Sequence, residues 1–322
     1  MAVLSAAQRD RFAEEGYLVV EHVLDPERDI APVVEEYGRV LDGIARSLLA
    51  EGAIRDTYAD LPFAERLTRI CEESGRNFPQ HFDFSLPQSG VRRDTPIHVG
   101  PAVFGLLSNP RLLDVAQDLL GPEVFSNPVQ HIRMKLPHRA VSKQGWSGLV
   151  SQIPWHQDNG VLLPEADDAT ILTVWLPITD STIENGCLQV IPGSHREGLL
   201  AHCPSDKSLS IPDKLLPTDQ ALPLPMRAGS ALLMTQRTVH SSLDNVTNDE
   251  VRISFDLRYQ PTGQPSGRPV FPGFVARSQA NPDSVLRDPA VWAQRWLAVR
   301  DQLAAQQDPS YNRWTADAAV CA

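Results

Sequence analysis

The chain has 322 residues, of which 42% are hydrophobic and 21% are charged, and its formal net charge at pH 7 is −11. This balance is typical of a soluble globular protein, and without a long Lys/Arg block it argues against nucleic-acid binding. No apolar stretch approaches the roughly 20 residues that a membrane span needs, so no membrane partner is expected. The N-terminus also lacks a basic segment followed by an apolar run, which disfavours a secretory signal.

The cysteines are scattered along the chain and show no CxxC spacing. They are Cys71, Cys187, Cys203 and Cys321. This pattern predicts neither a disulfide framework nor a thiolate zinc site. A reducing cytoplasm is therefore the expected setting.

The N-terminal part, residues 1–122, is predicted to form a helical and mixed support. Ser5 and Gln8 fit a capping box, and Gly16 is placed to end the helix that they begin. Asp25 before Pro26 predicts the start of a longer helix that runs to about residue 49. The other elements expected here are a strand over 17–20 and helical stretches near 61–73 and 110–120.

Short β-rich runs separated by Pro, Gly and Asn dominate from about residue 123 onward. They cover residues 171–178, 187–191, 231–234 and 251–259. Such strands without intervening helices predict a sandwich or barrel. We therefore expect one domain over 1–322, mainly β with flanking helices (α+β), whose double-stranded β-helix (jelly-roll, cupin-like) core covers 123–262. Residues 263–322 form a C-terminal extension, where Asp288 and Pro289 open a helix with a Trp292/Trp296 stripe typical of core packing.

The run over 251–259 alternates strictly between apolar and polar residues. The polar positions are Arg252, Ser254, Asp256 and Arg258. A period of two places all four on one face of a strand. That face is either the solvent side of an edge strand or the polar interior of a barrel, and the pattern alone does not decide between them.

A pair of imidazoles and one carboxylate forms the facial triad of non-haem iron sites, often written as His-x-Asp/Glu with a distant His. Three His-x-acid matches begin at His81, His156 and His195, against about one expected by chance. His240, after an apolar run, is the natural distal ligand. His195 lies only 45 residues before it, and His81 precedes the β-rich region. His156 lies 84 residues before it, which leaves room for four or five strands, so we predict a metal site of His156, Asp158 and His240.

Arg252 and Ser254 follow the distal histidine by 12 and 14 residues. The planar guanidinium of an arginine can hold a carboxylate through two hydrogen bonds, and a serine adds a hydroxyl donor. This pair suits the remote carboxylate of 2-oxoglutarate.

Five short motifs occur in order along the β-rich region. They are Pro154–Asp158, Trp175–Pro177, Glu184–Leu188, Pro192–His195 and His240 with Arg252-x-Ser254. With the N-terminal pattern from Phe12 to Val20, they make the chain resemble the phytanoyl-CoA dioxygenase family of iron(II)/2-oxoglutarate oxygenases over roughly residues 10–262.

The resemblance implies roles for individual residues. It assigns iron to His156, Asp158 and His240, the 2-oxoglutarate C5 carboxylate to Arg252 with Ser242 or Ser254, and the co-substrate pocket to Trp175 and Met134. A basic residue that touches the co-substrate in some relatives has only Arg92, Arg93 and His98 as candidates.

The implied activity converts 2-oxoglutarate and O2 to succinate and CO2 while hydroxylating an unactivated C–H bond of a small metabolite or natural-product intermediate. The carboxylate of Asp158 disfavours halogenation, since halogenating relatives have a small residue there. Desaturation, epoxidation or cyclisation by the same triad remain alternatives. A non-catalytic jelly-roll binding protein and a zinc hydrolase are alternatives from other classes. A monomer or a homodimer is expected.

Overall fold

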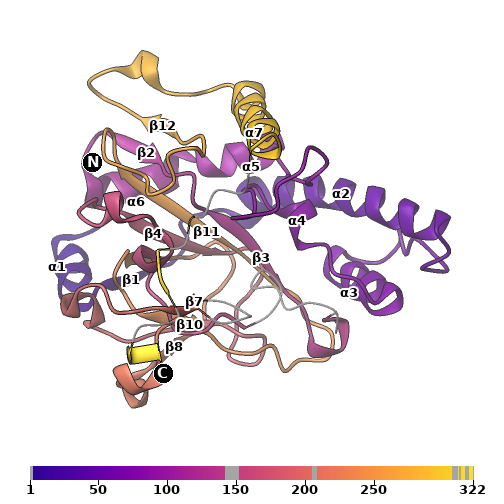
Figure 1. Cartoon of the computed structure of the whole chain (residues 1–322), viewed down its shortest axis with the longest axis horizontal. Coiled ribbons are helices and arrows are strands. Elements are labelled where there is room, and N and C mark those ends of the chain that lie inside the picture. The colour runs from indigo at the N-terminus through magenta and orange to yellow at the C-terminus, as the bar shows by residue number, and fades with distance from the viewer. Residues whose placement is uncertain are drawn as a thin grey trace.

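The computed structural model describes residues 3–141, 152–204, 209–306, 311, 313–315 and 319–321. Two antiparallel sheets form its centre, and helices cover the outer face of the larger one (Figure 1). The helices are α1 (Ala6–Glu15), α2 (Ala31–Ala50), α3 (Phe63–Ser74), α4 (Pro79–Phe82), α5 (Pro101–Leu107), α6 (Pro110–Leu120) and α7 (Pro289–Ala304). The strands are β1 (Tyr17–Val20), β2 (Val124–Ser126), β3 (His131–Lys135), β4 (Leu172–Pro177), β5 (Leu188–Val190), β6 (Cys203–Pro204), β7 (Leu209–Ser210), β8 (Leu222–Leu224), β9 (Ala231–Thr235), β10 (His240–Ser242), β11 (Arg252–Pro261) and β12 (Phe274–Arg277).

The larger sheet has the strand order β1-β9-β4-β11-β2-β12, with β3 also paired to β11. The smaller sheet has the order β10-β5-β8, and β6 pairs with β7. The expected mixed α+β fold of the jelly-roll class is therefore confirmed, although the described strands do not close into a continuous barrel. Among the described helices, none has both the length and the apolar character that crossing a bilayer requires.

β11 is the central strand of the larger sheet, and it decides which of the two readings of its alternating pattern is correct. Ile253, Phe255 and Leu257 face the helices and join the main hydrophobic core. The polar residues of the other face are buried too, and Arg252 is 0% exposed. β11 is thus no edge strand, and its polar face lies in the interior between the two sheets.

The N-terminal elements begin and end where the capping signals predict. Ser5 and Gln8 form both hydrogen bonds of the capping box of α1. Gly16 ends the helix with φ 79°, a left-handed conformation that glycine adopts at little cost. Asp25 accepts hydrogen bonds from two backbone N–H groups at the start of a single π-helical turn (Pro26–Ile30) that leads into α2.

The C-terminal helix α7 packs as its tryptophan stripe predicts, with Trp292 and Trp296 each 1% exposed. The cysteines require a correction. Cys203 and Cys321 form a disulfide across 118 residues of sequence, whereas Cys71 and Cys187 are free and buried. The spacing of the cysteines in the sequence did not predict this disulfide, because Cys321 comes close to β6 only in the folded chain.

Phe255 lies at the centre of the helix-facing core, with its ring 5.3 Å from that of Phe84 and 6.3 Å from that of Tyr37, between centroids. We expect Phe255→Ala to lower the free energy of unfolding by about 3–5 kcal/mol, because it removes a fully buried ring and leaves a cavity. Val246→Ala, at a side chain that is 68% exposed, should change it by less than about 0.5 kcal/mol. Chemical unfolding measures both, and equal midpoints would contradict the assigned core.

Candidate metal centre

Three possible metal ligands converge between the sheets. His156, Asp158 and His240 each offer a ligand atom, these atoms lie within 4.8 Å of one another, and all three residues are buried. The backbones of His156 and His240 pair in an antiparallel bridge, with both N–H···O distances 3.0 Å. Asp158 starts the 3-10 turn that follows His156, and His240 starts β10. Residues 84 positions apart in the chain therefore meet through the pairing of two backbone segments.

The imidazole rings are oriented for metal binding by their backbone contacts. Nδ1 of His156 lies 2.9 Å from the carbonyl oxygen of Pro154, and Nδ1 of His240 lies 2.9 Å from that of Thr238. An N–H at Nδ1 that donates to a carbonyl leaves the lone pair of Nε2 free as a ligand. Burial, and next to it His240, holds the pKa of His156 well below its usual range, which favours the neutral ligand form. The donor set fits a divalent transition metal such as iron.

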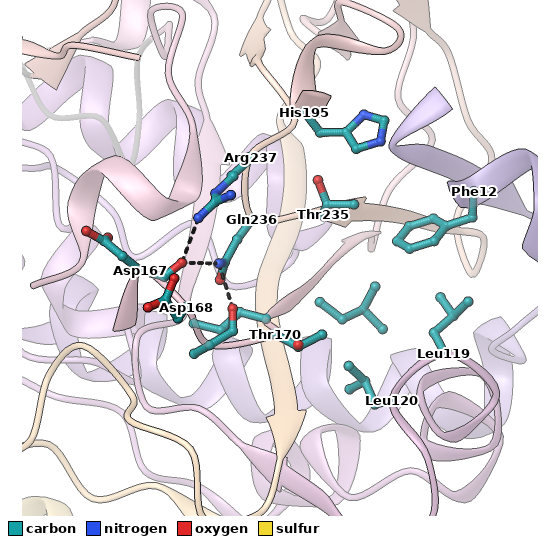
Figure 2. A pocket seen from close by; sticks show the side chains of 13 residues that line it. Phe12, Leu119, Leu120, Asp167, Asp168, Thr170, His195, Thr235, Gln236 and Arg237 are labelled. Atoms are coloured by element: carbon teal, nitrogen blue, oxygen red, sulfur yellow. Dashed lines mark hydrogen bonds between the residues drawn. The ribbon is translucent and has the colours of Figure 1, made fainter. Parts of the chain in front are cut away.

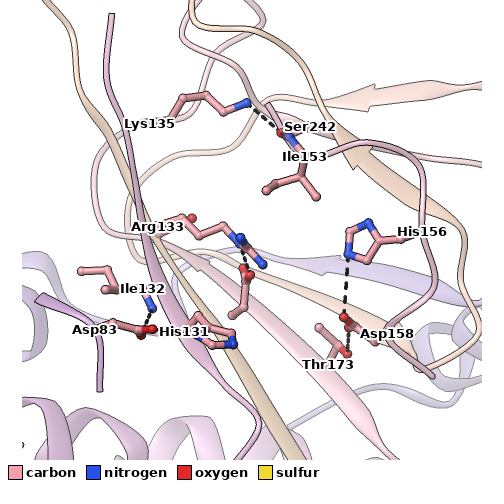
Figure 3. A network of polar contacts seen from close by, with 12 residues as sticks. Asp83, His131, Ile132, Arg133, Lys135, Ile153, His156, Asp158, Thr173 and Ser242 are labelled. Atoms are coloured by element: carbon pink, nitrogen blue, oxygen red, sulfur yellow. Dashed lines mark hydrogen bonds and ion pairs between the residues drawn. The ribbon is translucent and has the colours of Figure 1, made fainter. Parts of the chain in front are cut away.

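Protein donors hold both carboxylate oxygens of Asp158. Arg258 donates to Oδ1 and Thr173 donates to Oδ2 (Figure 3 shows the contact with Thr173). Burial alone would raise the pKa of Asp158, but the charge of Arg258, and after it the imidazoles, hold this pKa well below its usual range. The group is therefore a carboxylate, the form that binds metals.

Arg252 is a buried cation, and only part of its guanidinium is hydrogen-bonded to described residues. Its Nη1 donates to Oγ of Ser254, while Nε and Nη2 have no hydrogen-bond partner among the described residues. Its guanidinium carbon lies 5.4 Å from the ring centroid of Trp175. Burial lowers the pKa of Arg252 to about 10, so it stays charged at neutral pH. Buried hydrogen-bond donors without partners are rare, because each one lowers the stability of the fold. This guanidinium is therefore suited to binding an anion.

Lys135 is a second buried basic residue, and no motif in the sequence pointed to it. It lies directly opposite Arg252 in the β3–β11 register. Its Nζ donates to Oγ of Ser242 at 2.7 Å and to the carbonyl of Leu243. Burial, and next to it the charge of Arg252, lowers the pKa of Lys135 to about 6. The signal that could have found it is the alternation within β3, which puts His131, Arg133 and Lys135 on one face.

The three earlier candidates for an upstream basic residue lie elsewhere. His98 is bonded to Glu36 of α2 at 2.8 Å. Arg92 pairs with the neighbouring Asp94 at the surface, and Arg93 is exposed as well. Lys135 is the basic residue that the structure places beside Arg252.

The remaining predicted pocket residues divide between the two faces of the sheet. Trp175 and Ser254 share the polar face with Arg252, and Oγ of Ser242 receives hydrogen bonds from Lys135 and from the N–H of Ile153. The structure corrects the prediction that Met134 lines the co-substrate pocket. It pairs with Ile253 in the helix-facing core, because successive residues of a strand point to opposite sides, so it does not face the triad.

Two further polar pairs involve residues of β3 in the larger sheet. His131 Nδ1 is 2.8 Å from Oδ2 of Asp83 (both labelled in Figure 3), and Arg133 forms an ion pair with Asp256. The charge of Arg133 is close enough to help lower the pKa of His156. Single-sequence patterns gave no signal for these pairs, since each joins segments far apart in the chain.

The other His-x-acid matches contribute nothing to the triad. His195 lies against Gly16, with Nε2 3.1 Å from the carbonyl of Ala13. It lines a separate cavity of about 390 Å³ near α1 and α6, where Phe12, Leu119 and Arg237 are also found (Figure 2). None of the residues that line this cavity belongs to the triad or to the Arg252 group.

Removing one of the proposed ligands should strongly weaken metal binding. We expect Asp158→Ala and His240→Ala to weaken Fe(II) binding, measured by anaerobic calorimetry, by more than the roughly 10–100-fold that loss of an outer-shell contact costs. His195→Ala is the matched control and should bind as the wild type does. Undiminished affinity in His240→Ala would show that the metal is held elsewhere.

Lys135 should make stability depend on pH. Between its folded pKa of about 6 and its unfolded value of 10.5, the unfolded chain binds more protons, so the free energy of unfolding should rise with pH. One proton gives at most about 1.4 kcal/mol per pH unit. In chemical unfolding at pH 7, 8 and 9, Lys135→Met should show a flatter rise than the wild type. Equal slopes for Lys135→Met and wild type would refute this.

Comparison with known proteins places the chain in a family. The family model for phytanoyl-CoA dioxygenase (PhyH) matches residues 12–254. Phytanoyl-CoA dioxygenase domain-containing protein 1 of Mus musculus is 35% identical over 263 residues, which cover 76% of this chain and 86% of the relative. The ectoine dioxygenase of Streptomyces anulatus is 27% identical over 293 residues, or 84% of this chain and 85% of that protein.

A solved structure supports the fold. The apo form of the non-heme monooxygenase ThoJ superposes with a TM-score of 0.58 at 19% identity, covering 92% of this chain and 96% of that one. Together with the extent of the family match, these similarities identify the protein at the level of its family. The chain belongs to the phytanoyl-CoA dioxygenase family and is an iron(II)- and 2-oxoglutarate-dependent oxygenase.

Proposed function

We propose that His156, Asp158 and His240 hold the iron and that the enzyme hydroxylates an unactivated C–H bond of a small metabolite or natural-product intermediate. The observation that carries this proposal is the meeting of three buried ligand atoms with two buried basic side chains, Arg252 and Lys135, to which no carboxylate of the described residues is bonded. We further propose that the whole chain, 1–322, works as one oxygenase domain.

Arg252 and Lys135 provide the site for the remote carboxylate of 2-oxoglutarate. The free Nε and Nη2 donors of Arg252 match the two oxygens of a carboxylate, and Ser254 supports the guanidinium from the neighbouring position. Lys135, whose pKa of about 6 leaves it mostly uncharged at neutral pH in the free protein, adds a nitrogen donor from β3, and the ring of Trp175 forms one wall. An anion bound here would give the spare donors of Arg252 the partners that they lack.

The protein contributes position and exclusion of water. Bound iron supplies the oxidation, which is coupled to conversion of 2-oxoglutarate and O2 into succinate and CO2. The backbone contacts of His156 and His240 hold the two rings in fixed orientations, and the burial of all three ligands keeps solvent from the reacting centre. Desaturation, epoxidation and cyclisation need the same triad and are outcomes of the same product analysis.

A small substrate fits the charge of the chain better than an acyl-CoA. A net charge of −11 provides no long-range attraction for so anionic a ligand. The relative named ectoine dioxygenase also supports a small molecule as substrate. Nothing in the comparisons favours a non-catalytic binding protein.

Succinate formation tests this function directly. The purified protein, with Fe(II), ascorbate, 2-oxoglutarate and O2, is incubated with a panel of candidate metabolites, and mass spectrometry detects a gain of one oxygen atom. Substrate-dependent succinate in the wild type and none in Asp158→Ala is the expected result. Turnover with Zn(II) in the absence of O2 would instead support a hydrolase.

Arg252→Ala should mainly weaken the binding of 2-oxoglutarate. Loss of a buried charge-assisted contact is worth about 1.5–3 kcal/mol, or roughly 10- to 150-fold in affinity. Calorimetry on the Co(II)-loaded protein measures this without turnover. The control is Arg268→Ala, another buried arginine, which lies outside the proposed pocket and should keep wild-type affinity. Unaltered 2-oxoglutarate affinity in Arg252→Ala would show that the carboxylate binds elsewhere.

A further inference from the structure

Arg258 and Thr173 form a cradle for the carboxylate of Asp158. The two residues lie directly opposite each other in the β11–β4 register, so their side chains leave the same face of the sheet. Arg258 donates to Oδ1 and Thr173 donates to Oδ2, and all three side chains are nearly inaccessible to solvent. The second guanidinium nitrogen, Nη1, donates to the carbonyl of Val129, which anchors the arginine from its other side.

This arrangement restricts how the carboxylate can bind. Each carboxylate oxygen has two lone pairs, and here each already uses one of them on a protein donor. With both oxygens held, the group cannot rotate about its Cβ–Cγ bond. A carboxylate without such partners can bind a metal through one oxygen or through both, and the two-oxygen mode occupies an additional coordination position.

The positive charge of Arg258 acts in the same direction. Asp158 and Arg258 together carry no net charge, so the proposed ligand set contributes little negative charge of its own. A bound divalent cation therefore keeps most of its positive charge for an anionic co-substrate. Removing Arg258 would strengthen the attraction of the site for a cation and weaken its attraction for a dianion.

We propose that Arg258, assisted by Thr173, is a positioning residue that makes Asp158 bind the metal through one oxygen and so keeps the positions of the 2-oxo acid open. The inference rests on the proposed ligand set. It assigns a function to the far end of the polar face of β11, six residues beyond the proposed carboxylate anchor, Arg252.

The test uses Co(II) as the probe, because it reports coordination by its absorption and avoids turnover. Co(II) affinity is measured by spectroscopic titration, and 2-oxoglutarate affinity of the Co(II)-loaded protein by calorimetry. For Arg258→Met we expect Co(II) affinity equal to or above that of the wild type, and 2-oxoglutarate affinity lower by roughly tenfold or more. Thr173→Val should leave Co(II) affinity unchanged and lower 2-oxoglutarate affinity by a smaller factor.

Arg268→Met is the matched control, since this buried arginine also donates to a carbonyl, that of Val161, but has no bond to a carboxylate of the described residues. It should change neither affinity. Arg258→Lys keeps the charge with one donor group in place of the fork, and should recover part of the 2-oxoglutarate affinity. A purely structural role predicts that both affinities fall together in Arg258→Met, and that result would overturn the proposal.

Two outcomes separate this inference from the function on which it rests. A wild-type protein that binds neither Co(II) nor 2-oxoglutarate would refute the proposed metal centre itself. A wild type that binds both, together with an unchanged 2-oxoglutarate affinity in Thr173→Val and Arg258→Met, would refute only the role of the cradle. If Arg258→Met fails to fold, Thr173→Val decides the question, because its small, uncharged change removes one of the two contacts.

Discussion

A row of charged and polar side chains buried on one face of β11 is the constraint on which this structure depends. A charge can be buried only when other groups compensate it, so each residue of this face needs a partner supplied from another part of the chain. Arg258 has Asp158, Asp256 has Arg133, and Ser254 accepts from Arg252. The contact of Arg258 holds the turn at Asp158 over the larger sheet, and the bond from Lys135 to Ser242 joins β10 of the smaller sheet to it.

The compensation of buried charge is uneven along β11. At one end, the ion pair of Arg258 and Asp158 is complete within the protein. At the other end, Arg252 and Lys135 lie opposite each other, and no carboxylate of the described residues is bonded to either. The site is therefore cationic where the anionic co-substrate is proposed to bind and neutral where the metal is proposed to bind. The helix-facing side of the same strand packs into the main hydrophobic core, so β11 separates this core from the interior that contains the proposed metal site.

Local signals in the sequence predicted local structure well. The capping box at Ser5, the glycine at position 16 and the aspartate before Pro26 each act through contacts within a few residues, so the sequence around them suffices. The same holds for the period of two in 251–259, which assigned the side chains of this segment to the two faces of β11. Met134 shows that a residue role transferred from a family motif can fail. Successive residues of β3 point to opposite sides of the sheet, so an alignment that is off by one residue assigns the role to a side chain on the wrong face.

The sequence by itself determined the residue types of the proposed metal ligands, the order of the strands along the chain, and the two faces of the central strand, since these depend on residue identity and on periodicity. Only the tertiary structure decided that this polar face is interior, that Lys135 stands beside Arg252, that Arg258 and Thr173 hold Asp158, and that Cys203 meets Cys321. Each of these depends on which strands become neighbours, and strand pairing is set by the packing of the whole domain, which no local pattern encodes.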